Sequence, residues 1–133
     1  MDFSIRKLNP SDYEDVLVGW WRDWSWQAPA KDFLPENGEG GLMVMLDDKP
    51  VCAGFIYISN SKVAWVEWII SDKKHKEKRK EAINLLLDKL IFTCKNLNMK
   101  YIFATNDNKN LINTFINKGF RKGSITTELI KKL

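Results

Sequence analysis

One acidic residue lies inside an otherwise apolar segment, at Glu67 in the sequence VAWVEWIIS. Its neighbours include Trp65 and Trp68. Indole walls exclude water and disfavour a charged carboxylate, so we expect the pKa of Glu67 to be raised. A carboxylate with a raised pKa can act as a general base near neutral pH. The alternative is a strand glutamate held in a structural hydrogen bond, and the residues alone leave both interpretations open.

A strongly basic run follows this segment, with Lys, Arg or His at seven of the eight positions from 73 to 80. At the start of a helix such a run can pair with phosphate groups, or it can be an ordinary solvated surface. Positive charges in a first helical turn oppose the helix dipole by about 0.3–1 kcal/mol each, and bound phosphates would relieve that cost. The candidate phosphate ligands are Lys76, Lys78, Arg79 and Lys80.

Four of the six tryptophans lie between positions 20 and 26. Trp20, Trp21 and Trp24 continue an apolar stripe at helical spacing, which predicts core packing. Four tryptophans exceed what one stripe needs, so part of the cluster is a candidate for a ligand pocket or a protein interface. A nearby acid could attract a positively charged group to such a pocket. The candidate substrate-binding residues are Trp24, Trp26, Phe33 and Asp32.

Composition describes a soluble globular domain. The chain has 133 residues, 44% hydrophobic and 29% charged, and a net charge of +4. These values predict one domain over residues 1–133, with no disorder and no strong demand for an anionic partner. No apolar run reaches the ~20 residues of a membrane span, and MDFSIRKLNP has no secretory h-region, so we expect a cytoplasmic protein without membrane partners. Two isolated cysteines and one histidine predict no metal site.

The elements that must position these residues follow from periodicity. Strands are predicted for residues 3–8, 41–46, 51–58, 63–71, 100–105 and 125–130, and helices for residues 9–24, 77–97 and 106–120. The order β-α-β-β-β-α-β-α-β predicts an α/β (α+β) fold with a mixed, mostly antiparallel twisted sheet and helices on both faces.

Local signals refine three of these elements. Ser11 and Glu14 have the capping-box spacing for the first helix. Strict alternation along residues 63–71 predicts Glu67 and Ile69 on one face and Trp68 on the other, together with Ala64, Val66 and Ile70. The nearly continuous apolar run at residues 100–105 predicts a buried strand beside a parallel neighbour.

This order and several of its residues resemble the GNAT superfamily of acyl-CoA-dependent N-acyltransferases. The segment NKNLINTFINKGF is similar to the family's C-terminal signature, Asn-x-x-Ala-hydrophobic-x-hydrophobic-Tyr-x-x-x-Gly-Phe. Asn108, Ile112, Gly119 and Phe120 are in register, whereas Phe115 stands where tyrosine is common. The segment VEWIISD resembles the family's fourth strand. The lysine and asparagine bias also resembles small GNAT-like proteins of tailed phages.

The resemblance implies a reaction and a set of site residues. It implies transfer of an acetyl group from acetyl-CoA, without a metal, to an amine of a small molecule or protein that attacks directly in a ternary complex. Glu67 would be the general base, in a cleft where the fourth and fifth strands separate. Phe115 cannot donate a proton as the family's tyrosine does. The implied cofactor-binding residues are Ile69, Ile70, Ser71, Lys76, Lys78, Arg79, Lys80, Asn108 and Phe115.

The sequence departs from the family at the turn before the long helix. The family has glycines there that close around the pyrophosphate, whereas residues 75–81 contain none. This departure leaves two alternatives open: a catalytically inactive GNAT-like domain that binds a protein, or nonspecific binding of nucleic acid through the basic run. The aromatic residues do not interleave with that run, which disfavours nucleic acid. Members of the family are often dimers, so a homodimer is expected.

Overall fold

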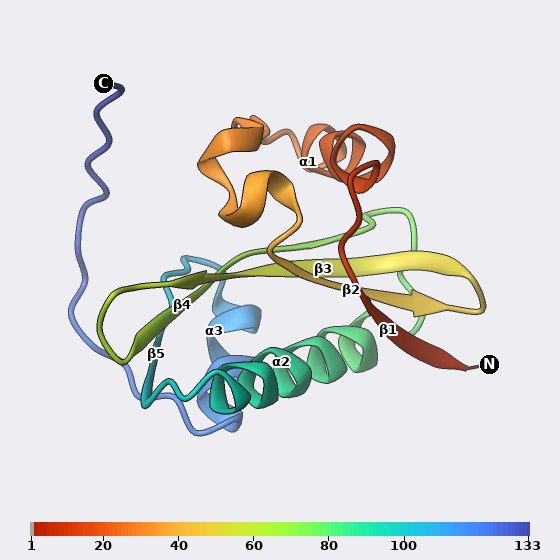
Figure 1. Ribbon diagram of the computed structural model, residues 1–133. Helices are drawn as coiled ribbons and strands as arrows, with labels where there is room; N and C mark the ends of the chain where they lie inside the picture. The colour runs from red at the N-terminus through yellow and green to blue at the C-terminus, as the bar shows by residue number, and fades with distance from the viewer. Residues whose placement is uncertain (1) are drawn as a thin grey trace.

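The computed structural model describes residues 2–133 and contains one five-stranded sheet (Figure 1). Its strands lie in sequence order and are β1 (Phe3–Lys7), β2 (Gly41–Leu46), β3 (Lys49–Ile58), β4 (Val63–Ser71) and β5 (Tyr101–Phe103). Neighbours from β1 to β4 pair antiparallel, and β5 pairs parallel with β4. The predicted mixed, mostly antiparallel sheet is therefore confirmed.

Helices cover both faces of the sheet, as predicted (Figure 1). One layer contains the long helix α2 and the short helix α3, and the other contains a π-helical turn that runs into α1 and two 3-10 turns. Among residues 2–133, no helix is both long and apolar enough to cross a membrane. The helical elements are η1 (Tyr13–Leu17), α1 (Val18–Asp23), η2 (Lys31–Phe33), η3 (Pro35–Gly38), α2 (Arg79–Asn96) and α3 (Lys109–Asn117).

Each layer has its own apolar core. On one side, Leu86 and Leu90 of α2 are fully buried against the sheet, as the 3.6-residue stripe predicts. On the other side, Trp21 and Leu17 are buried against Phe55 of β3. The helical stripe of tryptophans is thus mainly a core stripe, and it fixes α1 on the sheet.

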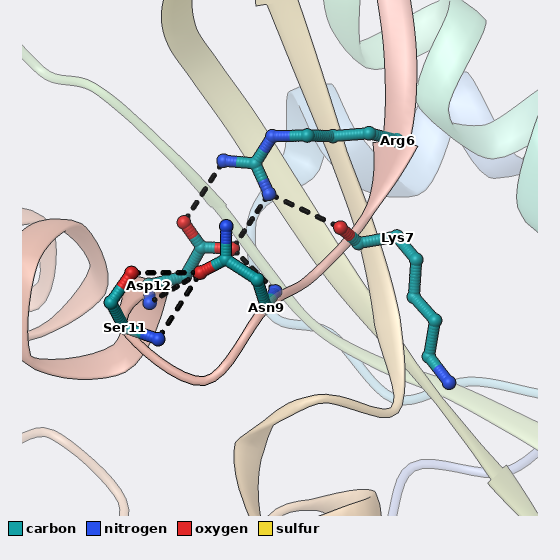
Figure 2. Close-up of polar contacts among 5 residues, drawn as sticks. All are labelled: Arg6, Lys7, Asn9, Ser11 and Asp12. Atoms are coloured by element: carbon teal, nitrogen blue, oxygen red, sulfur yellow. Dashed lines mark hydrogen bonds and ion pairs between the residues drawn. The ribbon is translucent and has the colours of Figure 1, made fainter.

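The start of the first helical segment is held by a polar cluster, which Figure 2 shows. The side-chain oxygen of Asn9 accepts hydrogen bonds from the backbone N–H groups of Ser11 and Asp12, both at 3.1 Å. The Asp12 carboxylate in turn accepts two bonds from Arg6, at 2.8 and 2.9 Å. The predicted capping box of Ser11 and Glu14 is wrong. Asn9 accepts the backbone N–H groups at the start of the helical segment, and Glu14 instead forms an ion pair with Lys31 of η2.

A β-bulge interrupts β4. The register between β3 and β4 shifts between Ala53 and Phe55, so β4 has one residue more than β3 there. Trp68 lies in this extra stretch with φ +58°. The single β3 residue opposite is Gly54, where an added Cβ would lie 2.6 Å from the Ile69 Cδ1 atom, so the end of the Ile69 side chain would have to move.

The bulge changes which side chains share a face. Ile69 packs with the core under α2, as do Ala64 and Val66, whereas Trp68 and Ile70 pack with the core under α1. The prediction that Trp68 and Ile70 lie on the same face as Ala64 and Val66 is wrong, because the extra residue reverses the alternation.

Two predictions about the C-terminal third also differ from the structure. Residues 125–130 form no strand, and residues 121–133 carry no helix or strand at all. The strand at residues 101–103 is paired on one side alone, so Tyr101 and Phe103 are 65% and 53% exposed instead of buried. Both differences have one cause: β5 is the edge of the sheet in this chain.

Candidate active site

Glu67 bridges the two strands that pair in parallel. Its Oε1 atom accepts a hydrogen bond of 2.7 Å from the backbone N–H of Thr105, and its Oε2 atom accepts one of 2.6 Å from the Thr105 hydroxyl. Thr105 follows β5 by two residues. The half-buried carboxylate therefore has a fixed position at the end of the β4–β5 ladder.

The pKa of Glu67 is raised above its ordinary value. Burial is the main cause, and the negative charge of Glu128 adds to it, while the two hydrogen bonds from Thr105 act in the opposite direction. The direction agrees with the expectation from the sequence. A carboxylate with a raised pKa holds a proton more readily than an ordinary exposed glutamate, as a general base requires.

The parallel ladder beside Glu67 is short. It contains three pairs, and Trp65 with Phe103 is the last of them. Beyond that pair, β4 continues to Ser71 with β3 on one side and, within residues 2–133, no strand on the other. Within residues 2–133, residues 66–71 of β4 therefore have no strand paired on the β5 side, and Glu67 lies where the ladder ends.

Aromatic side chains surround this end of the sheet on the α1 side. The Trp68 indole N–H donates to the Tyr57 hydroxyl at 2.8 Å, and that hydroxyl donates to the Phe33 carbonyl at 3.0 Å. The Phe33 ring meets the Trp68 indole edge-on, with centroids 6.0 Å apart. Burial raises the pKa of Tyr57, and the charge of Glu67 adds to this, so its hydroxyl stays protonated.

A second aromatic pair extends the same surface toward the sheet edge. Trp65 stacks on Phe103 with ring centroids 4.4 Å apart. Trp65 pairs across the strands with Tyr57, and Glu67 pairs with Phe55 of the α1-side core, so these side chains share one face. We call this surface the aromatic platform; its residues are Phe33, Tyr57, Trp65, Trp68 and Phe103.

The basic run forms the loop before α2 and the first residues of that helix. Lys78 precedes the helix with φ +65°, a conformation that usually favours glycine, and no side chain caps the helix start. The guanidinium of Arg79 folds back onto the loop, donating to the carbonyls of Asp72 and Lys73 at 3.1 and 2.8 Å. Its Nε atom and the Nε2 atom of His75 are buried and have no hydrogen-bond partner within residues 2–133. Arg79 thus organises the loop.

Trp24 packs against this loop. Its indole N–H donates to the Ser71 carbonyl at 2.8 Å, and its ring lies 5.2 Å from the Lys73 ammonium and 5.4 Å from the Arg79 guanidinium. Trp26 stacks on it with centroids 5.7 Å apart and is 53% exposed. The two tryptophans therefore belong with the basic loop.

The predicted substrate residues consequently divide into two groups. Phe33 lies on the aromatic platform, beside Trp68. Trp24 and Trp26 lie at the basic loop, and Asp32 is exposed on η2. This arrangement does not support a single acceptor pocket made by all four residues.

The remaining predicted cofactor residues have varied surroundings. Lys76 and Lys80 are exposed, and Lys78 forms an ion pair with Glu81 at 3.6 Å. Asn108 caps α3 by accepting a 3.0 Å bond from the Leu111 N–H, as expected. The others are more enclosed: Ile70 and Ser71 are buried, Ile69 is half-buried, and Phe115 is buried in the core under α2 and meets Phe120 edge-on at 4.9 Å.

Sequence reasoning missed two residues of this site. Tyr57 lies in an apolar strand that reads as core, and its role depends on the bulge that turns Trp68 toward it. Thr105 is 38 residues from Glu67, and no local pattern links them. Only the parallel pairing of β4 with β5 brings the two segments together.

Solved structures share this fold. The model superposes on glucosamine-6-phosphate N-acetyltransferase from Arabidopsis thaliana with a TM-score of 0.71 and 16% identity, over 99% of this chain and 100% of that chain. For an acetyltransferase of the GNAT family from Staphylococcus aureus Mu50, the TM-score is 0.68 at 19% identity, over 92% of this chain and 87% of that chain. For N-acetylglutamate synthase from Neisseria gonorrhoeae, solved with coenzyme A and N-acetyl-glutamate, it is 0.73 at 14% identity, covering 93% of this chain and 29% of that chain.

The chain therefore has the fold of the GNAT acetyltransferases. No protein-family model matches its sequence, and no curated protein matches it closely enough to count as a relative. The expected fold class is confirmed by structure, although the sequence identity to these neighbours is low.

Proposed function

We propose that this protein is an N-acetyltransferase that moves an acetyl group from acetyl-CoA to an amine, within a single domain spanning residues 1–133. The fold supports the reaction class. The observation that carries the proposal is the position of Glu67: a carboxylate with a raised pKa, held by Thr105 where the β4–β5 ladder ends.

The reaction assigns a role to that carboxylate. Glu67 takes a proton from the acceptor ammonium, directly or through water, and passes it to solvent. The neutral nitrogen attacks the thioester carbonyl carbon, so a C–N bond forms and the C–S bond breaks. The second proton moves from nitrogen to the leaving sulfur, which gives an amide and the free thiol. Phe115 stands where the family commonly has a tyrosine that protonates the leaving thiolate. Without that proton donor, we expect the thiolate to leave more slowly.

The start of α2 is suited to the phosphates of the co-substrate. Among residues 2–133 no side chain caps it, so its first N–H groups are available to an anion at the positive end of the helix dipole. Lys78 adopts the positive φ that glycine provides in the family's loop, and Arg79 holds the loop carbonyls. Exposed Lys76 and Lys80, with the half-buried Lys78, would supply charge to the phosphates.

The pantetheine arm would follow the unpaired side of β4. Ile69 and Ile70 lie on that part of β4, beyond the last β4–β5 pair, while the Ser71 carbonyl already accepts a hydrogen bond from Trp24. The acceptor would approach over the aromatic platform, where ring faces and Glu67 favour an ammonium group. This places an amine of a small molecule or an exposed protein amine above Glu67.

Calorimetric titration with acetyl-CoA and CoA tests the proposal. We expect micromolar binding that the triple variant Lys76/Lys78/Lys80→Ala weakens by at least about tenfold. A matched control replaces three exposed lysines at the other end of α2, Lys62, Lys95 and Lys100, with alanine and should bind normally. Absence of binding at millimolar ligand would contradict the proposal and favour the alternative of a protein-binding domain.

A further inference from the structure

The aromatic platform is an ordered surface that presents ring faces beside the proposed base. Trp65 stacks on Phe103 with ring centroids 4.4 Å apart, and Phe103 is 53% exposed. Trp68 donates to the Tyr57 hydroxyl, which donates to the Phe33 carbonyl, so hydrogen bonds hold these side chains in place. A surface that is ordered before binding loses little conformational entropy when a ligand arrives. The platform is therefore suited to recognising part of the acceptor.

The charges that act on this surface are negative, although the chain as a whole is positive. The net charge is +4, and the chain contains 21 lysines and arginines. Burial is the main cause of the raised pKa of Glu67, and the charge that adds to it is that of Glu128, another acid. Burial also raises the pKa of Tyr57, and the charge that adds to it is that of Glu67. Both groups are thus in a negative local potential.

Basic side chains of the neighbouring segments are engaged with other groups. Lys31 of η2 forms an ion pair with Glu14 at 3.2 Å. Lys73 and Arg79 lie over the Trp24 ring, in the loop that follows β4 and at the start of α2. An anionic group bound on the platform would therefore meet two carboxylates without any of these three cations as a partner.

A cation and an anion have very different binding free energies on such a surface. The face of an aromatic ring attracts an ammonium group, and so does a carboxylate. A carboxylate or phosphate on the ligand would be repelled, and it would lose hydration without gaining a partner. The same surface therefore favours one class of acceptor and rejects another.

We propose that the acceptor is an aliphatic diamine. One ammonium group reaches Glu67, and the second lies over the stacked Trp65–Phe103 pair. Glu128 supplies the opposite charge for the second ammonium group, and amines that carry a carboxylate or phosphate in its place are rejected. This inference names the acceptor class of the proposed acetyltransferase and rests on that function.

Binding of three amines of equal carbon number tests the acceptor class without relying on catalysis. The probes are cadaverine, pentylamine and δ-aminovalerate, whose far ends carry an ammonium group, a methyl group and a carboxylate. NMR spectra of the indole N–H groups locate each probe, with buried Trp20 as the internal reference. We expect cadaverine to shift the Trp65 and Trp68 signals with a dissociation constant at least about threefold below that of pentylamine. δ-Aminovalerate should bind at least about tenfold more weakly than cadaverine.

Paired substitutions test the two groups that select the far end of the amine. Phe103→Leu removes a ring and should raise the dissociation constant of cadaverine roughly twofold to fivefold, with a smaller effect on pentylamine. Phe103→Tyr keeps the ring face and should bind cadaverine as wild type does. Glu128→Gln should reduce the preference for cadaverine over δ-aminovalerate at least about threefold.

Two matched controls change similar side chains away from the platform. Phe92→Leu replaces an equally exposed aromatic residue (51%) on α2, and Asp48→Asn replaces an exposed acid in the turn between β2 and β3. Both controls should leave the order of the three affinities unchanged. Loss of the preference in either control as large as in Phe103→Leu or Glu128→Gln would overturn the assignment of the platform.

Rates of acetyl transfer to the same three amines separate this inference from the proposed function. Wild type should acetylate cadaverine with the highest kcat/KM, after division by its two equivalent amino groups. Transfer that favours δ-aminovalerate, or equal affinities for the three amines, would overturn the acceptor class and leave the proposed acetyltransferase activity intact. Binding in the expected order without transfer to any of the three would support the platform as a diamine site and contradict the proposed acetyl transfer.

Discussion

Glu67 and Thr105 are 38 residues apart in sequence, yet the carboxylate of Glu67 receives both the hydroxyl and the backbone N–H of Thr105, at 2.6 and 2.7 Å. This contact joins β4 to the segment after β5 at the point where their ladder ends. It also opposes the effect of burial on the pKa of Glu67, because hydrogen bonds to a carboxylate favour its charged form.

The first prediction concerns that hydroxyl. Thr105→Val removes one of the two bonds, so the pKa of Glu67 should rise further and the acidic limb of the kcat/KM profile should move to higher pH. Below neutral pH, activity should fall roughly threefold to tenfold, which corresponds to the ~0.5–1.5 kcal/mol net contribution of an ordinary hydrogen bond. Thr105→Ser keeps both donors and should retain the wild-type profile. An unchanged profile for the valine variant would show that Glu67 is not the titrating group.

Asp12 gives a second prediction, on stability. Burial alone would raise the pKa of this carboxyl, but the bonds from Arg6 and the Asn9 N–H outweigh burial and lower it. A carboxyl with a lowered folded-state pKa stabilises the fold above its unfolded pKa, near 3.9, and loses that effect as pH falls through the folded value. Asp12→Asn should therefore cost about 2 kcal/mol at pH 7 and much less near pH 2. Urea unfolding at both pH values measures this, and an equal cost at both would contradict it.

The bulge in β4 gives a third prediction. An alanine Cβ at Gly54 would lie 2.6 Å from Ile69 Cδ1 and 3.0 Å from Leu90 Cδ1, so the core under α2 would be overpacked. Gly54→Ala should destabilise the protein by about 1–3 kcal/mol. Gly123→Ala, where no atom lies within 4 Å of the new Cβ, should change stability by less than about 0.5 kcal/mol. Thermal unfolding of the two variants compares them, and similar losses would refute the packing argument.

A fourth prediction separates loop order from charge. Arg79→Gln and Lys80→Gln each remove one positive charge from the basic run, but of these two side chains it is Arg79 that donates to the carbonyls of Asp72 and Lys73. We expect the arginine variant to speed amide hydrogen exchange in residues 72–78. We also expect it to weaken CoA binding about tenfold, whereas the lysine variant should weaken CoA binding about threefold. Equal effects of the two variants on binding and on exchange would mean that Arg79 contributes charge alone.

Much of the fold could be predicted from the sequence because periodicity records burial. The stripe of α2 and the tryptophans of α1 pointed to the two cores that the structure contains. Alternation failed at Trp68, since a bulge adds one residue without a local signature beyond the glycine opposite it. It failed again at residues 125–130, where strand composition is present but no partner edge is engaged.

The site was predicted less completely than the fold. Glu67 could be found because an acid in an apolar strand is unusual. Its pKa is raised mainly by burial, as the neighbouring indoles suggested. Thr105 and Tyr57 could not, since their contacts depend on strand pairing and on the bulge. The basic run was recognised, but its sequence does not reveal that Arg79 is engaged with the loop carbonyls.

The measurement that tests the central claim most directly is release of CoA thiol from acetyl-CoA, with a panel of primary amines, for wild type and Glu67→Gln across pH 5–9. We expect amine-dependent release by wild type that increases as Glu67 loses its proton. In the glutamine variant it should fall about 10²–10⁴-fold, with unchanged acetyl-CoA affinity. Equal amine-dependent rates for the two proteins at every pH would contradict the assignment of Glu67 as the base.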